Sequence, residues 1–235
     1  MLSSITQRLK GRSMAQIVQL VGHNIAYHAR EMTPQARRRN RQFRAFDAQW
    51  GTDTFGMREL HTLSVDPDLA VHARRYQASN GGNMPTWFAD LNVDFGRTAF
   101  IDFGCGKGRA VLEAARFPFA RVIGVEFAPE LVEIAERNRA IMMARGALAA
   151  PVEFVCMDAG RYEPPTDPDL VCFFYDPFGD AVMAPVADRL TAFDQPVSII
   201  YLEPNCIGQF RRSGRWTEGV SVDNLVLRNP AALAR

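Results

Sequence analysis

The sequence of 235 residues has few cysteines and no paired ones. Its four cysteines, at positions 105, 156, 172 and 206, lack the close spacing typical of a zinc site or a disulfide framework. Three of them lie within or at the end of apolar segments. We therefore expect reduced thiols in the core of a cytoplasmic protein.

Long apolar runs are also missing. No run approaches the roughly 20 residues that a membrane-spanning helix needs. The first residues contain no continuous apolar block followed by a small-residue cleavage site, which argues against a secretory signal. With 47% hydrophobic residues, the composition instead predicts a soluble α/β domain with one core.

Histidine and lysine are scarce where they would carry chemistry. All four histidines, at positions 23, 28, 61 and 72, precede the motifs described below, so we expect neither a metal site nor a histidine base. The only lysines are Lys10 and Lys107, and no Tyr-x-x-x-Lys pair occurs. The missing pair argues against a nicotinamide-dependent oxidoreductase.

Acidic residues are almost absent from the start of the chain. Residues 1–46 hold nine lysines or arginines and one acid, Glu31, whereas the remaining residues hold 18 bases and 25 acids. The basic part ends in an arginine cluster, 37–44, which we expect on a helix that begins at Pro34. The cluster can contact nucleic acid, but docking on the acidic remainder of the same chain is the favoured interpretation.

The periodicity before the arginine cluster predicts two amphipathic helices. Leu2, Ile5 and Leu9 share one helical face, and residues 17–25 form another. A helical cap or a dimer contact is favoured over a mitochondrial presequence or an interfacial anchor. We expect a basic helical extension over 1–50, a linker and cap region over 51–97, and a catalytic domain over 98–235.

The most informative segment runs from Ala99 to Arg109. An apolar run breaks there into Asp102 and three glycines at alternate positions, Gly104, Gly106 and Gly108. The pattern predicts a strand, a tight loop and a helix start, whose amide groups favour a negatively charged ligand. The Gly-x-Gly-x-Gly spacing differs from the Gly-x-Gly-x-x-Gly of dinucleotide-binding folds.

Three more expected strands follow in order. Residues 121–126 end at Glu126, residues 152–159 reach Asp158 and Ala159, and residues 170–178 end in a polar, aromatic and proline cluster. A helix is expected over 180–193, a fifth strand over 196–202, and a final pair over 220–222 and 224–227. These elements predict a seven-stranded, mostly parallel sheet with helices on both faces and ligands at the strand ends.

The ordered motifs resemble those of the class I S-adenosylmethionine-dependent methyltransferases, whose fold is Rossmann-like. The resemblance covers residues 98–205 and implies S-adenosyl-L-methionine as cofactor. It implies that Asp102 holds the methionine amino group, that Glu126 accepts hydrogen bonds from both ribose hydroxyls, and that Phe127 lies against the adenine. The other implied cofactor residues are Gly104, Cys105, Gly106 and Gly108 under the methionine and ribose, and Asp158 and Ala159 at the adenine edge.

These acids have a plainer interpretation as well. An acid between a strand and a helix is often a helix N-cap. For Glu126 a cap is plausible because Ala128-Pro129-Glu130 opens a helix. Capping does not explain why the motifs occur in this order.

The segment Tyr175-Asp176-Pro177-Phe178 is similar to the Asn/Asp-Pro-Pro-Tyr/Phe signature of amino-group methyltransferases, with one proline missing. The resemblance implies N-methylation, with Asp176 and Tyr175 as the catalytic residues. The alternative is a strand end that only supports the cofactor.

The first motif also resembles that of the protein-lysine, DOT1-like group. The acceptor stays open among a protein lysine, an RNA base and a small amine.

Two functions of other classes remain as alternatives. A nicotinamide oxidoreductase is disfavoured by the glycine spacing. A non-catalytic binding module, with the arginine cluster contacting RNA or a protein partner, is disfavoured by the intact acids at the strand ends.

Overall fold

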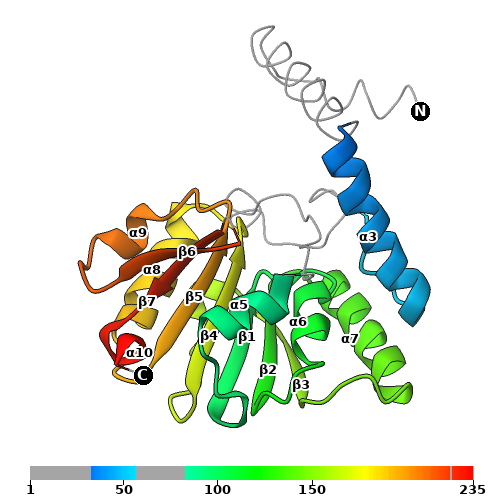
Figure 1. The fold of residues 1–235 in the computed structure, drawn as a ribbon, viewed down its shortest axis with the longest axis horizontal. Coiled ribbons are helices and arrows are strands. Elements are labelled where there is room, and N and C mark those ends of the chain that lie inside the picture. Colours follow the sequence, from blue (N-terminus) through cyan, green and yellow to red (C-terminus); the bar gives the residue numbers. More distant parts are fainter. Residues whose placement is uncertain (1–32, 57–82, 223, 235) are drawn as a thin grey trace, which may run out of the picture. The chain divides into compact units, whose positions relative to one another are not determined.

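The computed structural model describes residues 33–56, 83–222 and 224–234 (Figure 1). By their internal contacts, residues Phe46–Arg235 form one compact unit, and residues Met1–Ala45 group separately. The two expected N-terminal helices and all four histidines lie outside the described residues.

The compact unit is built on a seven-stranded sheet, which confirms the predicted α/β class. The spatial order is β3-β2-β1-β4-β5-β7-β6. Strands β1 to β5 pair in parallel, and β7 is antiparallel to both β5 and β6. The strands are β1 (Thr98–Phe103), β2 (Arg121–Glu126), β3 (Val152–Cys156), β4 (Asp169–Tyr175), β5 (Val197–Leu202), β6 (Thr217–Ser221) and β7 (Asn224–Arg228).

Helices cover both faces of the sheet (Figure 1). On one face, α5 (Met84–Asp90) and α6 (Arg109–Ala114) bury Trp87 and Val111 against strand residues such as Phe100. On the other face, α8 (Asp180–Thr191) and α9 (Gly208–Arg211) pack on Ile101 and its neighbours. Because successive residues of β1 face opposite layers, both sides must be apolar, which explains its continuous apolar run.

The remaining described elements connect or flank these layers. They are α3 (Pro34–Trp50), α7 (Pro129–Ala144), α10 (Pro230–Leu233), and the short 3-10 helices η3 (Phe95–Arg97) and η4 (Ala159–Arg161). Helix α7 packs on β2 and β3 and touches α6. None of the described helices is both long and apolar enough to cross a membrane.

Two expectations near β3 need correction. We expected the strand to reach Asp158, but β3 ends at Cys156, and Asp158 instead begins η4. We expected the cysteines in the core, and Cys105, Cys172 and Cys206 are buried, but Cys156 is exposed. The exposure of Cys156 follows from the place of β3 at the edge of the sheet, where only β2 pairs with it.

The helix expected from Pro34 is confirmed as α3, which continues to Trp50. Arg41 and Arg44 of the arginine cluster are exposed. Trp87 of α5 is fully buried and packs on Phe173 with ring centroids 5.8 Å apart. It is therefore an anchor between α5 and the sheet.

Gly108 should be among the glycines least tolerant of substitution. Its φ is +82°, and an added Cβ would lie 2.7 Å from the Phe154 ring. Gly146 is a matched control, because its φ is +62° but no atom lies within 4 Å of such a Cβ. We expect Gly146→Ala to cost about 1 kcal/mol of stability and Gly108→Ala to cost clearly more, roughly 2–4 kcal/mol with the steric overlap included.

Urea denaturation of the two variants measures both costs. Equal losses would mean that Phe154 moves aside at no cost and that backbone conformation alone makes glycine necessary at position 108.

Candidate functional site

The loop between β1 and α6 holds three glycines in a backbone conformation that other residues resist. The φ angles of Gly104, Gly106 and Gly108 are +84°, +54° and +82°. The backbone N–H groups of Gly104 and Cys105 donate to the Val125 carbonyl at 2.8 and 3.1 Å. The loop therefore folds back over the end of β2, as the glycine pattern predicts.

Glu126, the last residue of β2, is tied to this loop. One carboxylate oxygen accepts the Gly106 N–H at 2.9 Å, and the other accepts the Ala128 N–H at 3.0 Å. The N-cap position of α7 is Ala128, so Glu126 does not occupy it. Burial raises the pKa of Glu126, and these backbone donors oppose that shift. The carboxylate keeps acceptor capacity for a ligand hydroxyl.

Asp102 lies one strand away and has a different environment. Its side chain, on β1, is buried, and no hydrogen bond reaches its carboxylate from the described residues. Burial, followed by the charge of Glu126, raises the pKa of Asp102 well above its usual range. A cationic group beside Asp102 would reverse that shift. The site therefore fits the ammonium group of a methionine moiety.

The residues expected beside the adenine follow β2 and β3. Phe127 is half-buried, and its carbonyl lies 3.8 Å from the Cys156 thiol sulfur. The Asp158 carboxylate accepts the Gly160 N–H at 2.9 Å, so Asp158 does cap η4. Ala159 is buried beside it. The other carboxylate oxygen of Asp158, Oδ2, lies 3.8 Å from Nε of Arg161, whose side chain is largely exposed.

The segment expected to bear the chemistry follows β4. Asp176 has a φ of +39°, which is uncommon for a residue other than glycine, and its N–H donates to the Leu202 carbonyl at 3.2 Å. A Cβ added to Gly104 would lie 2.6 Å from Pro177 Cβ. The strand end that carries Tyr175 and Asp176 therefore touches the glycine-rich loop directly.

The structure brings the predicted site residues together. They follow or end β1, β2, β3 and β4, four neighbouring parallel strands whose carboxyl ends share one edge of the sheet. Among the described residues, no group of three histidines, cysteines or acids could hold a metal ion.

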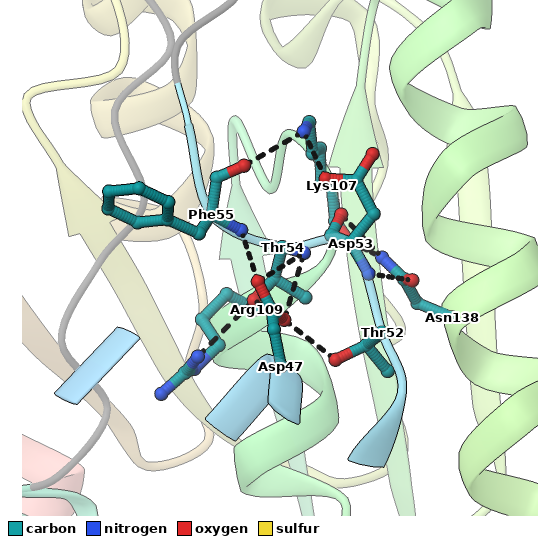
Figure 2. Close-up of polar contacts among 8 residues, drawn as sticks. All are labelled: Asp47, Thr52, Asp53, Thr54, Phe55, Lys107, Arg109 and Asn138. Atoms are coloured by element: carbon teal, nitrogen blue, oxygen red, sulfur yellow. Dashed lines mark hydrogen bonds and ion pairs between the residues drawn. The ribbon is translucent and has the colours of Figure 1, made fainter. Parts of the chain in front are cut away.

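Residues 52–55, a segment that we call the strap, make contacts with the site that sequence reasoning did not predict. Figure 2 shows the strap beside the glycine-rich loop, where Lys107, Arg109 and Asn138 bond to it. One signal was present in the sequence. Lys107 is one of only two lysines and lies between two of the motif glycines, where a solvated cation is not expected.

Residues 100–193, from β1 through α8, match a family model described as a methyltransferase domain. No curated protein sequence matches the chain.

The solved structures with some likeness include three that are described as methyltransferases or putative methyltransferases. An RNA methyltransferase from Salinibacter ruber, in complex with S-adenosyl-L-homocysteine, is 23% identical with a TM-score of 0.45, over 64% of this chain and 90% of that one. A putative RNA methyltransferase from Pyrococcus horikoshii is 17% identical with a TM-score of 0.46, over 72% and 90%. A magnesium protoporphyrin IX methyltransferase from Synechocystis is 14% identical with a TM-score of 0.42, over 63% and 77%.

TM-scores this low assign no acceptor, and the comparisons give no support to the narrower resemblance to the DOT1-like group. The family model, by contrast, spans the glycine-rich loop and all four strand ends that carry the predicted motifs. Residues 100–193 match a methyltransferase domain, and this match supports a methyltransferase that uses S-adenosyl-L-methionine.

Proposed function

We propose that the acceptor of this methyltransferase is an amino nitrogen, which Asp176 and Tyr175 place beside the methyl donor. The observation that carries the proposal is the close approach of Pro177 to Gly104. This contact puts the polar end of β4 next to the loop that receives the methionine part of the cofactor. A protein lysine, an RNA base and a small amine all offer such a nitrogen.

The cofactor contacts that we propose follow from the chemistry of each group. The Asp102 carboxylate pairs with the methionine ammonium, and Glu126 accepts hydrogen bonds from the ribose hydroxyls. Phe127 lies against the adenine, with Asp158 and Ala159 at its edge. The backbone at Gly104, Cys105, Gly106 and Gly108 passes under the methionine and ribose.

S-adenosyl-L-methionine supplies a sulfonium-bound methyl group, whose C–S bond breaks as the nitrogen attacks in line from the opposite side. The residues of this chain contribute alignment. The acceptor nitrogen must be neutral to attack, and Asp176 accepts a hydrogen bond from its N–H so that the lone pair faces the methyl carbon. Tyr175 is half-buried at the same strand end and bounds this position. The proton released from nitrogen leaves to solvent.

Transfer of tritium from methyl-labelled S-adenosylmethionine into a cell extract tests the acceptor. The extract is separated into protein, RNA and small-molecule pools. The expected result is label in one pool, attached to nitrogen and therefore retained in mild alkali. Release of the label as methanol would place it on a carboxyl oxygen and overturn the proposal. Glu126→Ala and wild-type protein with excess S-adenosylhomocysteine are the two blanks. No label from folded protein would favour the binding-module alternative.

We expect a substitution of Asp176 to lower the turnover rate strongly and to change cofactor affinity little. Asp176→Gly removes the carboxylate but accepts the φ of +39° without strain. We expect kcat to fall about 100-fold, the size of effect that a misplaced reactant causes, while affinity for S-adenosylhomocysteine changes less than about twofold. Asp176→Asn keeps an acceptor oxygen and should recover much of the rate. Equal losses of turnover and affinity would place Asp176 in the cofactor site instead.

We expect the buried carboxylate of Asp102 to destabilise the ligand-free protein. Because its pKa in the folded protein is raised, its negative charge opposes folding at every pH above its unfolded value. We expect Asp102→Asn to stabilise the ligand-free protein at neutral pH by roughly 1–3 kcal/mol and to weaken cofactor binding. The stability gain should vanish as the pH falls below the unfolded pKa of aspartate.

Thermal melting across pH, with and without S-adenosylhomocysteine, measures both effects. The control is Asp194→Asn, at an exposed position, which should change neither. A destabilised Asp102→Asn protein would show that the carboxylate has a structural partner.

A further inference from the structure

The carboxylate of Asp47 holds the strap through several hydrogen bonds. Asp47, in the last turn of α3, accepts the Thr52 hydroxyl at 2.7 Å, the Thr54 N–H at 3.0 Å and the Phe55 N–H at 2.7 Å (Figure 2). These bonds fix the path of the chain where α3 ends. The strap is therefore a defined segment and not a loose connection.

Asn138 of α7 joins the strap to the glycine-rich loop. Its side-chain oxygen accepts the Asp53 N–H at 2.8 Å, and its amide nitrogen donates to the Asp53 carbonyl at 3.0 Å and to the Lys107 carbonyl at 3.1 Å. Asn138 is buried, so a lost bond would leave a polar group unsatisfied. One amide therefore fixes the backbone of the strap and the peptide between two motif glycines at once.

The Lys107 side chain makes a second connection. Its ammonium group bonds to Asp53 Oδ1 at 2.7 Å and to the Phe55 carbonyl at 3.0 Å. The Lys107 side chain is 5% exposed and that of Asp53 is 60% exposed. An ion pair with so exposed a partner contributes little to global stability. Its effect is to fix a position: it directs Lys107 toward the strap.

Arg109, the first residue of α6, holds the other side of the strap. Its guanidinium lies 3.7 Å from the centroid of the Phe46 ring, pairs with Glu113, and donates to the Thr54 hydroxyl at 3.2 Å. Lys107 and Arg109, the two cationic residues that flank Gly108, therefore both contact residues within 46–55. Figure 2 shows them converging on the strap from the loop and from α6.

We propose that Asp53, Lys107 and Asn138 are positioning residues, which hold the peptide between Gly106 and Gly108 in its cofactor-binding conformation by clamping it to the strap. The proposal rests on the proposed cofactor site. Three left-handed glycines in five residues leave this loop many alternative conformations. A clamp that removes those alternatives improves cofactor affinity without touching the cofactor.

The same coupling acts in the opposite direction. If the docked strap favours the cofactor-binding loop, then a bound cofactor must favour the docked strap by an equal factor. Cofactor binding should therefore slow local opening of residues 52–55.

Calorimetric titration with S-adenosylhomocysteine tests the clamp. We expect Asp53→Ala and Lys107→Met each to weaken affinity about tenfold, and Asp53→Asn, which keeps an acceptor oxygen, to lose less. The double variant Asp53→Ala with Lys107→Met should lose no more than the weaker-binding single variant, because both changes break one connection. The control is Asp167→Ala, which breaks an exposed ion pair with Arg121 at the opposite edge of the sheet and should leave affinity unchanged.

Hydrogen exchange provides a readout that a merely structural role would not change. In the wild type, saturating S-adenosylhomocysteine should slow exchange at the Asp53, Thr54 and Phe55 amides, and this protection should be lost in Asp53→Ala at equal saturation. Unchanged affinity in folded Asp53→Ala, or strap exchange indifferent to ligand, would overturn the clamp. A wild type that fails to bind S-adenosylhomocysteine would overturn the proposed cofactor site instead.

Discussion

The close approach of neighbouring side chains to the glycine backbone at and beside the glycine-rich loop is the constraint on which the rest of the site depends. A Cβ at Gly104 would overlap Pro177, one at Gly108 would overlap Phe154, and one at Gly124 would lie 2.7 Å from Cys105 Sγ. These contacts join the ends of β1, β2, β3 and β4. Glycine at these positions therefore sets both the shape of the loop and its distance from three neighbouring strands.

Charge at the site follows from that packing. Asp102 and Glu126 are buried on adjacent strands, and the charge of Glu126 acts on Asp102. Glu126 has backbone donors that stabilise its charge, whereas the pKa of Asp102 is raised by burial first and by Glu126 second. Such an arrangement is unfavourable in the free protein and favourable beside a cation. Binding sites commonly retain groups of this kind at a cost in stability.

Much of the fold follows from local patterns. The apolar runs predicted β2 over 121–126 and β5 close to its observed bounds, and the helix expected from Asp180 is α8. The three glycines take the left-handed conformations that their spacing indicated. Each of these features depends on residues close together in the chain, where periodicity and turn chemistry carry the information.

The missed features depend on pairs far apart in the chain. Asn138 binds Asp53 across 85 positions, and Lys107 reaches Asp53 across 54. Asn138 has no local signal, because an asparagine within a helical pattern normally indicates a polar surface. The position of β3 at the sheet edge exposes Cys156 and is likewise a property of the strand order. The clamp could be recognised only once the topology brought the three segments together.

The contact between Gly104 and Pro177 also bears on how the reaction is accelerated. Methyl transfer needs no acid, base or metal if donor and acceptor are held in line, and alignment alone can lower a barrier by up to about 7–11 kcal/mol. In this chain the glycine-rich loop and the strand end proposed to hold the acceptor touch through these two residues. Asp176 follows in a left-handed conformation that a free chain would rarely adopt. Such strain persists only where neighbours enforce it, so the same packing that shapes the glycine-rich loop also fixes Asp176, which we propose positions the acceptor nitrogen.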